Sequence, residues 1–164
     1  MHFTNKNIEI TLNQSVFMKK ILVLYYSRTG NTEKMATAVA KGAKINDEVD
    51  VELSFHIEPE ELSVFDAILV GTPTYNHEMP IDFKKLFEDV AVLGSSLKGK
   101  IGASFGSYGW TGEAPQQILE IMKNKLEMQI VEPPLRAKYV PDSKMVIACM
   151  DLGKRISENL MNKT

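Results

Sequence analysis

Apolar runs alternate with amphipathic stretches along most of the chain. The continuous apolar run at residues 21–24 predicts a strand that is buried on both faces. Residues 66–71 and 100–105 have the same character, and residues 49–55 alternate between apolar and polar positions. These segments predict four strands, and the stretches between them have helical spacing.

Three helices are predicted from apolar residues that recur every three or four positions. The first of these places on one face Phe83, Leu86, Phe87 and Val90. The second does the same with Ile118, Met122 and Leu126. The last begins with Asp142 and Ser143 as caps. Its apolar face, which we expect to dock on a sheet, consists of Met145, Cys149, Leu152, Ile156 and Leu160.

This alternation predicts an α/β fold, because parallel strands joined through helices require right-handed crossovers. We expect a doubly wound, five-stranded parallel sheet with helices on both faces, and 2-1-3-4-5 is among the strand orders that fit. Ligands in such sheets bind beyond the carboxyl ends of the strands, where the strand order reverses. The functional residues are therefore expected in the turns after the first, third and fourth strands.

The chain divides into residues 1–17, an amino-terminal extension, and residues 18–164, a single domain. Its 164 residues, 44% of them hydrophobic, suffice for one well-buried core. In the extension Ile8, Ile10 and Leu12 alternate with polar residues, as in a half-buried edge strand. A disordered segment, or residues added upstream of the natural start, explains it equally well. The extension lacks the apolar core of a secretory signal, so we expect it to be retained.

Composition excludes some classes of partner. A formal net charge of −2, without a run of Lys and Arg among aromatic residues, argues against nucleic-acid binding. No apolar stretch approaches the roughly 20 residues that span a bilayer. The single cysteine, Cys149, cannot form an internal disulfide, which favours a reducing cytoplasm. We expect a cytoplasmic monomer or homodimer that binds neither nucleic acid nor membranes.

The first of the three turns joins a buried strand to a helix and is rich in hydroxyl groups. It contains Ser27, Arg28, Thr29, Gly30, Asn31 and Thr32. The amino terminus of a helix has unpaired N–H groups and partial positive charge, so it attracts an anion such as phosphate. The turn lacks the lysine of a Walker loop and the later glycines of a dinucleotide fingerprint, which favours a mononucleotide phosphate. The alternative is that these residues only cap the helix.

The second and third turns suit a flat aromatic ligand. The second contains Thr72, Pro73, Thr74, Tyr75 and Asn76. Asn tolerates positive φ, and the tyrosine ring can stack on a ring system; an ordinary loop before the helix start at Pro80 is the alternative. The third contains Ser107, Tyr108, Gly109, Trp110 and Gly112. Two large aromatic side chains among glycines are hard to justify as core, so we interpret this turn as a binding site.

Together the three turns resemble those of the flavodoxin-like family. The segments FGSYGWTGEA at residues 105–114 and PPLRAKYVP at residues 133–141 resemble the flavodoxin domain of flavodiiron proteins in particular. The likeness runs from about Met18 to the end of the chain. It implies the strand order 2-1-3-4-5 and non-covalent FMN, with the first turn around the phosphate and the other two on either side of the isoalloxazine.

The chain departs from the family pattern in two respects. Clustered metal ligands like those of the flavodiiron metal domain are absent, since His2, His56 and His77 are scattered. We therefore expect no metal site and no reduction of oxygen or nitric oxide by this chain alone. Where many flavodoxins carry a glycine beside the flavin, the chain has Asn76, His77 and Glu78. The resemblance then implies weak stabilisation of the one-electron-reduced flavin.

Three functional classes remain for comparison. The first is a flavodoxin that carries low-potential electrons between redox partner proteins and needs no catalytic side chain. The second is a flavin-dependent NAD(P)H:quinone-type reductase of the same fold. The third, a phosphate-binding or response-regulator domain, lacks support because no aspartate cluster accompanies the phosphate turn. A further hypothesis is that His77 makes the flavin potential depend on pH near neutrality.

Overall fold

A computed structural model of the chain describes residues 18–94 and 96–162. The elements in chain order are β1 (Lys19–Tyr25), α2 (Asn31–Ala43), β2 (Val49–Ser54), the 3₁₀ helix η1 (Pro59–Val64), β3 (Ala67–Gly71), α3 (Ile81–Leu93), β4 (Ile101–Tyr108), α4 (Ala114–Asn124), β5 (Gln129–Ile130), β6 (Leu135–Lys138) and α5 (Ser143–Met161). The edge strand considered for residues 1–17 lies outside the described residues.

The strands form one parallel sheet in the order β2-β1-β3-β4-β5. The expected order 2-1-3-4-5 is confirmed. Its fifth position, however, holds two short strands: β5 pairs with the start of β4, and β6 pairs with its end. Pro133 and Pro134 lie between them, and proline has no N–H group to donate to a neighbouring strand. The fifth row of the sheet is therefore interrupted.

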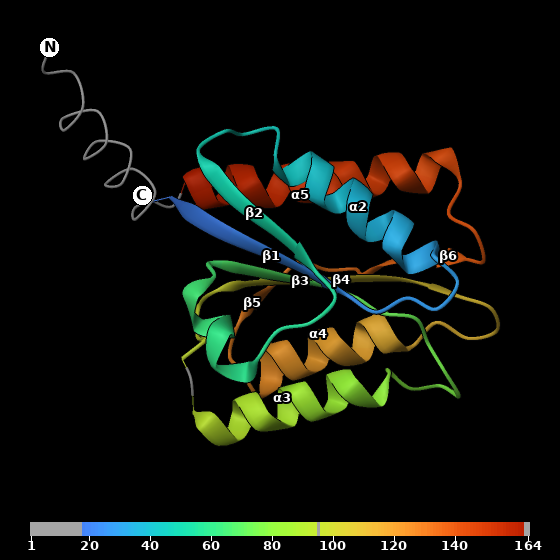
Figure 1. Ribbon diagram of the computed structural model, residues 1–164, viewed down its shortest axis with the longest axis horizontal. Helices are drawn as coiled ribbons and strands as arrows, with labels where there is room; N and C mark the ends of the chain where they lie inside the picture. Colours follow the sequence, from blue (N-terminus) through green and yellow to red (C-terminus); the bar gives the residue numbers. More distant parts are fainter. Residues whose placement is uncertain (1–17, 95, 163–164) are drawn as a thin grey trace, which may run out of the picture.

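Helices cover both faces of the sheet. In Figure 1, α2 and α5 lie on one side of the strands, and α3 and α4 lie on the other. Ile21 and Val23 of β1 point toward the α2 and α5 side, whereas Leu22 and Leu24 belong to the core on the α3 and α4 side. All four are buried, which confirms the expectation of a strand covered on both faces.

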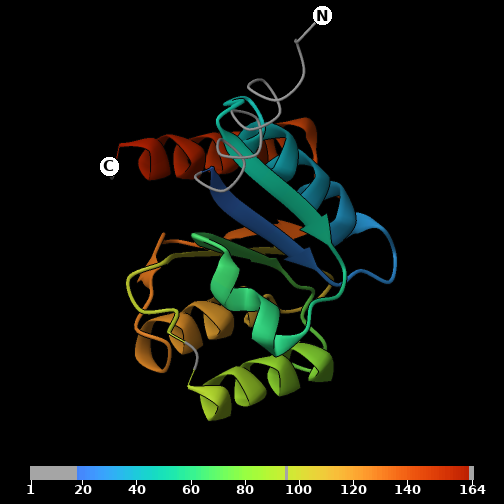
Figure 2. The same ribbon diagram turned by 60° about the vertical axis from the view of Figure 1, so that its left-hand side comes forward.

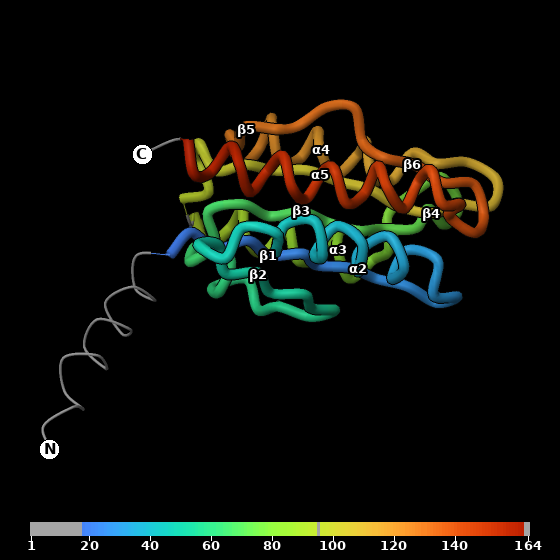
Figure 3. Tube along the Cα trace, turned by 90° about the horizontal axis from the view of Figure 1, so that it is seen from above, coloured from blue at the N-terminus to red at the C-terminus, as the bar shows by residue number. Residues whose placement is uncertain are grey.

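The last helix docks on the sheet as expected and also packs closely on α2. Helix α5 begins as predicted, with the Asp142 carboxylate accepting a 2.8 Å hydrogen bond from the Met145 N–H. Its apolar face shares one core with α2 and the sheet, and its closest contacts are with α2. Figure 3 shows the two helices side by side. The close approach depends on glycine, since a Cβ on Gly153 would lie 2.0 Å from the Val39 carbonyl oxygen.

Two helical segments also differ from the sequence pattern. The connection from β2 to β3 is the short η1, which lies with α3 on the same side of the sheet (Figure 2). The helix predicted from Ile118, Met122 and Leu126 ends at Asn124, so Leu126 follows it in the turn. Leu126 is nevertheless buried in the core beneath α3 and α4. Burial of that residue, rather than helix geometry, explains its apolar character.

Candidate functional site

The turns after β1, β3 and β4 meet at the carboxyl edge of the sheet, on the right in Figure 1. They enclose a cleft of about 180 Å³. Its lining consists of Ser27, Arg28, Thr29, Asn31, Thr32, Pro73, Thr74, Tyr75, Ser107, Tyr108, Gly109 and Tyr139. The structure therefore brings together residues from all three predicted turns and adds one residue from the segment after β6.

The first turn presents the open amino terminus of α2 to this cleft. Gly30, the N-cap residue, has φ of +88°, and no side chain caps the helix. The Ser27 hydroxyl instead accepts a 3.0 Å hydrogen bond from the Gly30 N–H. Because the first N–H groups of a helix have no partner within it, they stay available to an anion. Of the capping residues considered, Gly30 is the N-cap, and the N–H groups that no side chain caps fit a phosphate monoester.

Thr32 connects the first turn to the third. Its side chain is 2% exposed, and its hydroxyl oxygen accepts a 3.3 Å hydrogen bond from the Ser107 N–H. At the same junction Gly106 permits close contact between backbones, since a Cβ there would lie 1.7 Å from the Thr72 carbonyl oxygen. Short contacts between backbone groups therefore hold the turns together beside the cleft.

Tyrosine rings form the other walls of the cleft. Tyr75, Tyr108 and Tyr139 all line it, and the Arg28 guanidinium lies 4.6 Å from the centre of the Tyr75 ring. Tyr26 packs edge-on against Tyr75 with ring centres 6.2 Å apart. Burial raises the pKa of Tyr75, and the positive charge of Arg28 acts in the opposite direction. Such rings suit a planar ligand.

The segment after β3 is a tight hairpin. The Tyr75 N–H donates to the Glu78 carbonyl at 2.8 Å, and the Glu78 N–H donates back to Tyr75 at 3.0 Å. The two residues at the tip, Asn76 and His77, have φ of +49° and +67°. The expected tolerance of Asn76 for positive φ is confirmed. His77 is the unusual residue, because two-residue hairpins of this kind favour glycine at that position.

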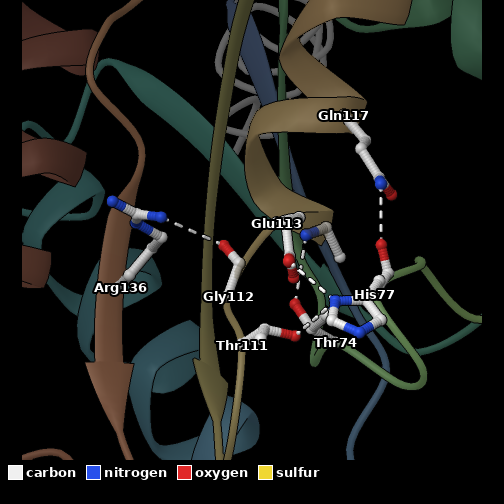
Figure 4. A network of polar contacts seen from close by, with 8 residues as sticks. Thr74, His77, Thr111, Gly112, Glu113, Gln117 and Arg136 are labelled. Carbon is white, nitrogen blue, oxygen red and sulfur yellow. Dashed lines mark hydrogen bonds and ion pairs between the residues drawn. The ribbon is translucent and has the colours of Figure 1, made fainter.

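Polar contacts join this hairpin to the loop between β4 and α4 (Figure 4). His77 Nδ1 lies 2.9 Å from Glu113 Oε1 and 3.2 Å from the Thr111 hydroxyl oxygen. Gln117 donates a 2.8 Å hydrogen bond to the His77 carbonyl. The Thr74 hydroxyl oxygen accepts a 3.1 Å hydrogen bond from the Ala114 N–H, at the first residue of α4. We refer to these contacts as the loop brace.

Five of the sixteen predicted site residues do not line the cleft. They are Gly30, Thr72, Asn76, Trp110 and Gly112. Trp110 is 79% exposed, and its ring lies 4.9 Å from that of His77. Gly112 leaves room for Tyr108, whose ring would lie 2.8 Å from an added Cβ. Contact between these five residues and a cofactor stays a prediction.

Tyr139 is the cleft residue that sequence reasoning missed. It has φ of +60°, its N–H donates to the Tyr108 carbonyl at 2.7 Å, and its carbonyl accepts from the Ser107 hydroxyl. Its place at the end of β6, a short strand that periodicity does not mark, explains the omission. The available signal was its position within the segment 133–141, which resembles flavodiiron proteins.

Two other expectations concern metals and membranes. Within residues 18–94 and 96–162, no three His, Cys, Asp or Glu side chains gather as they would around a metal ion. None of the helices in that same part of the chain has both the length and the apolar character needed to cross a bilayer.

Comparison with known proteins identifies the family. The flavodoxin family model matches residues 23–153. The chain belongs to the flavodoxin family. A solved flavodoxin from the domain Archaea is 37% identical with a TM-score of 0.79, and the match covers 87% of this chain and 99% of that one. The resemblance to flavodoxins and the flavodoxin-like fold are thereby confirmed.

Longer flavoproteins are also similar to this flavodoxin-family chain. The type A flavoprotein fprA of Rhodobacter capsulatus is 34% identical over 153 residues, which cover 88% of this chain and 34% of that protein. The flavodiiron core of Flv1 from Synechocystis has the same fold, with a TM-score of 0.80 at 21% identity over 96% of this chain and 41% of the other. The chain thus spans about a third of the length of fprA.

Flavodoxins bind FMN, and family membership confirms FMN as the expected cofactor. The residues present fit it. The open amino terminus of α2 suits the phosphate, and Tyr75 and Tyr108 provide ring surfaces on different loops for the planar group. The hydroxyl groups of Ser27 and Thr29 add hydrogen-bonding capacity at the phosphate end.

Proposed function

We propose that this flavodoxin-family protein carries low-potential electrons between redox partner proteins. One observation carries the proposal. Of the described residues that line the cleft, none has a carboxylate, an imidazole or a thiol. Arg28 and three tyrosines are its only ionisable groups. A site so composed is suited to holding a redox group rather than to moving protons for a substrate.

The chain's residues hold the cofactor and set its environment, while FMN when bound supplies the electron transfer. The N–H groups at the start of α2 bind the phosphate, and Tyr75 and Tyr108 orient the ring and exclude water from it. These rings offer little to offset added negative charge, and the phosphate is itself negative. Reduction is therefore disfavoured relative to free FMN, which lowers the potential.

A potentiometric titration tests this proposal. The purified chain, loaded with FMN and reduced stepwise, should show a midpoint potential for full reduction below that of free FMN under the same conditions. A midpoint equal to or above that of free FMN would contradict the role of low-potential carrier. The loaded protein should also remain yellow when NADH or NADPH is added alone. Rapid bleaching by either would instead support the NAD(P)H:quinone-type reductase.

A further inference from the structure

We propose that Glu113, acting through His77, is a positioning residue that fixes the two ring-binding loops relative to each other before FMN enters. The inference rests on the proposed FMN site. Neither Glu113 nor His77 lines the cleft. Their effect on the cofactor is therefore transmitted through neighbours, Thr74 and Tyr75 on the hairpin and Tyr108 and Gly109 on the other loop.

The backbone of His77 is the first reason. A φ of +67° is unfavourable for a residue with a Cβ, whereas glycine adopts it freely. Glycine would thus form this turn more easily than histidine does. The imidazole compensates with contacts that glycine cannot make, to Glu113, Thr111 and Trp110. What His77 provides at this position is its side chain.

The direction of these contacts is the second reason. All of them run from the hairpin to residues 110–117, so they join two segments that are far apart in the sequence. The Gln117 amide holds the His77 carbonyl, which limits rotation of the peptide at the tip of the hairpin. Arg136 of β6 donates a 3.3 Å hydrogen bond to the Gly112 carbonyl and anchors the same loop from its other side (Figure 4).

The state of the Glu113 carboxyl is the third reason. Hydrogen bonds from His77 and Thr111 lower its pKa, so the group is a carboxylate at neutral pH. A carboxylate 2.9 Å from Nδ1 holds the proton on that nitrogen and orients the ring. Its second oxygen, Oε2, is buried and has no hydrogen-bond partner among the described residues. The side chain as a whole is 41% exposed, so the brace lies at the surface beside the cleft.

The brace fixes the two ring-binding loops relative to each other. A site that is already ordered loses less conformational entropy when its ligand binds, so its affinity is higher. Loosening the brace should therefore weaken FMN binding without altering any group that touches FMN. It should also increase motion of the hairpin in the protein without FMN.

Two substitutions separate this role from an effect on the fold. His77→Gly relieves the strained turn, and this relief offsets the loss of the imidazole contacts, so the apoprotein should be about as stable as the parent, while FMN binding weakens. Glu113→Gln keeps the shape but removes the charge. Each should raise the Kd for FMN by about fivefold, the order of effect expected for the loss of one hydrogen bond that orders the site. Because the two residues act together, the double variant should bind FMN no more weakly than the single variants do.

Measurements on the apoprotein provide an independent readout. Hydrogen exchange at the Ala114 N–H, which donates to the Thr74 hydroxyl oxygen across the brace, should be faster in both variants than in the parent. His56→Gln is a matched control, because His56 forms a similar 2.8 Å contact with Glu58 in a different loop. It should leave both the exchange rate and the Kd unchanged.

Parental FMN affinity together with parental exchange in Glu113→Gln and His77→Gly would overturn the positioning role. A parent chain that binds no FMN would instead refute the site itself. Normal affinity with a high potential would refute only the role of low-potential carrier. The three failures are thus distinguishable.

Discussion

Different kinds of groups shape the two ends of the cleft: backbone at one end and side chains at the other. At the phosphate end, the turn at residues 27–32 uses backbone N–H groups, one glycine with positive φ and a helix without a side-chain cap. At the ring end, the hairpin and the loop before α4 are joined by side chains, above all His77 and Glu113. One end depends on the path of the main chain, and the other depends on residue identity.

This difference predicts how each end responds to substitution. Changes that move the backbone should be most harmful at the phosphate end, where many side chains can be replaced at little cost. At the ring end, changes of functional groups should matter even where the backbone can stay in place. The experiments below test that contrast in order of decreasing effect.

The largest effect is expected for Gly106→Ala, at the junction of the two ends. An added Cβ would lie 1.7 Å from the Thr72 carbonyl oxygen, which belongs to backbone and cannot rotate away. We expect a loss of about 3 kcal/mol in the free energy of unfolding, measured with urea. Gly109→Ala is the control, since its Cβ would meet the Tyr139 ring at an ordinary 3.5 Å. Equal stability of the two variants would contradict a close contact between the Gly106 and Thr72 backbones.

The second effect tests the phosphate turn alone. Gly30→Ala meets nothing within 4 Å, but its φ of +88° is unfavourable for alanine by about 1–2 kcal/mol. Stability should fall by that amount, and the Kd for FMN should rise while that for riboflavin, which has no phosphate, stays the same. Gly94→Ala is the control. Gly94 also has positive φ and nothing within 4 Å of an added Cβ, but it lies at the carboxyl end of α3. It should lose stability without changing FMN affinity.

A smaller, pH-dependent effect should mark the ring end. The pKa of Glu113 is lowered in the folded protein, so its stabilising contribution is present above the ordinary value near 4.5 and is lost as pH falls through the lowered pKa. Urea unfolding of the apoprotein should therefore show parent and Glu113→Gln differing at pH 6 and converging toward pH 3. A constant difference across that range would show that the carboxylate charge does not contribute.

The smallest effect is expected for Arg28→Ala. Its exposed guanidinium lies over the Tyr75 ring, and cation–π contacts at exposed positions are weak. Removal should weaken FMN binding by no more than about threefold, and Arg28→Lys should restore most of it if positive charge near the phosphate is what matters. A loss as large as that from Gly30→Ala would contradict the view that the backbone dominates at this end.

Much of this architecture could be predicted from local sequence patterns. Buried parallel strands have continuous apolar runs, such as residues 21–24, and the carboxyl ends of such strands meet at one edge. The positions of the three turns followed from that rule, and eleven of the sixteen predicted site residues line the cleft. Glycine also gave a reliable signal at Gly30, whose positive φ requires it.

Long-range side-chain contacts could not be predicted in the same way. His77 and Glu113 are 36 positions apart, and no periodicity relates them. The packing of α5 on α2 was missed because its apolar face has the same spacing whether it covers a sheet or a helix. Tyr139 follows a strand of four residues, too short to be marked by its own pattern.

Glycine contacts join α5, the last helix, to α2, whose amino terminus faces the cleft. A Cβ on Gly42 would lie 1.9 Å from the Met150 carbonyl oxygen, so the two backbones nearly touch. Near their amino ends, Lys34 also reaches the Pro141 carbonyl at 3.4 Å. The position of α2 therefore depends on the packing of α5. Shortening α5, or attaching a bulky tag at its end, is a remote way to disturb anion capture.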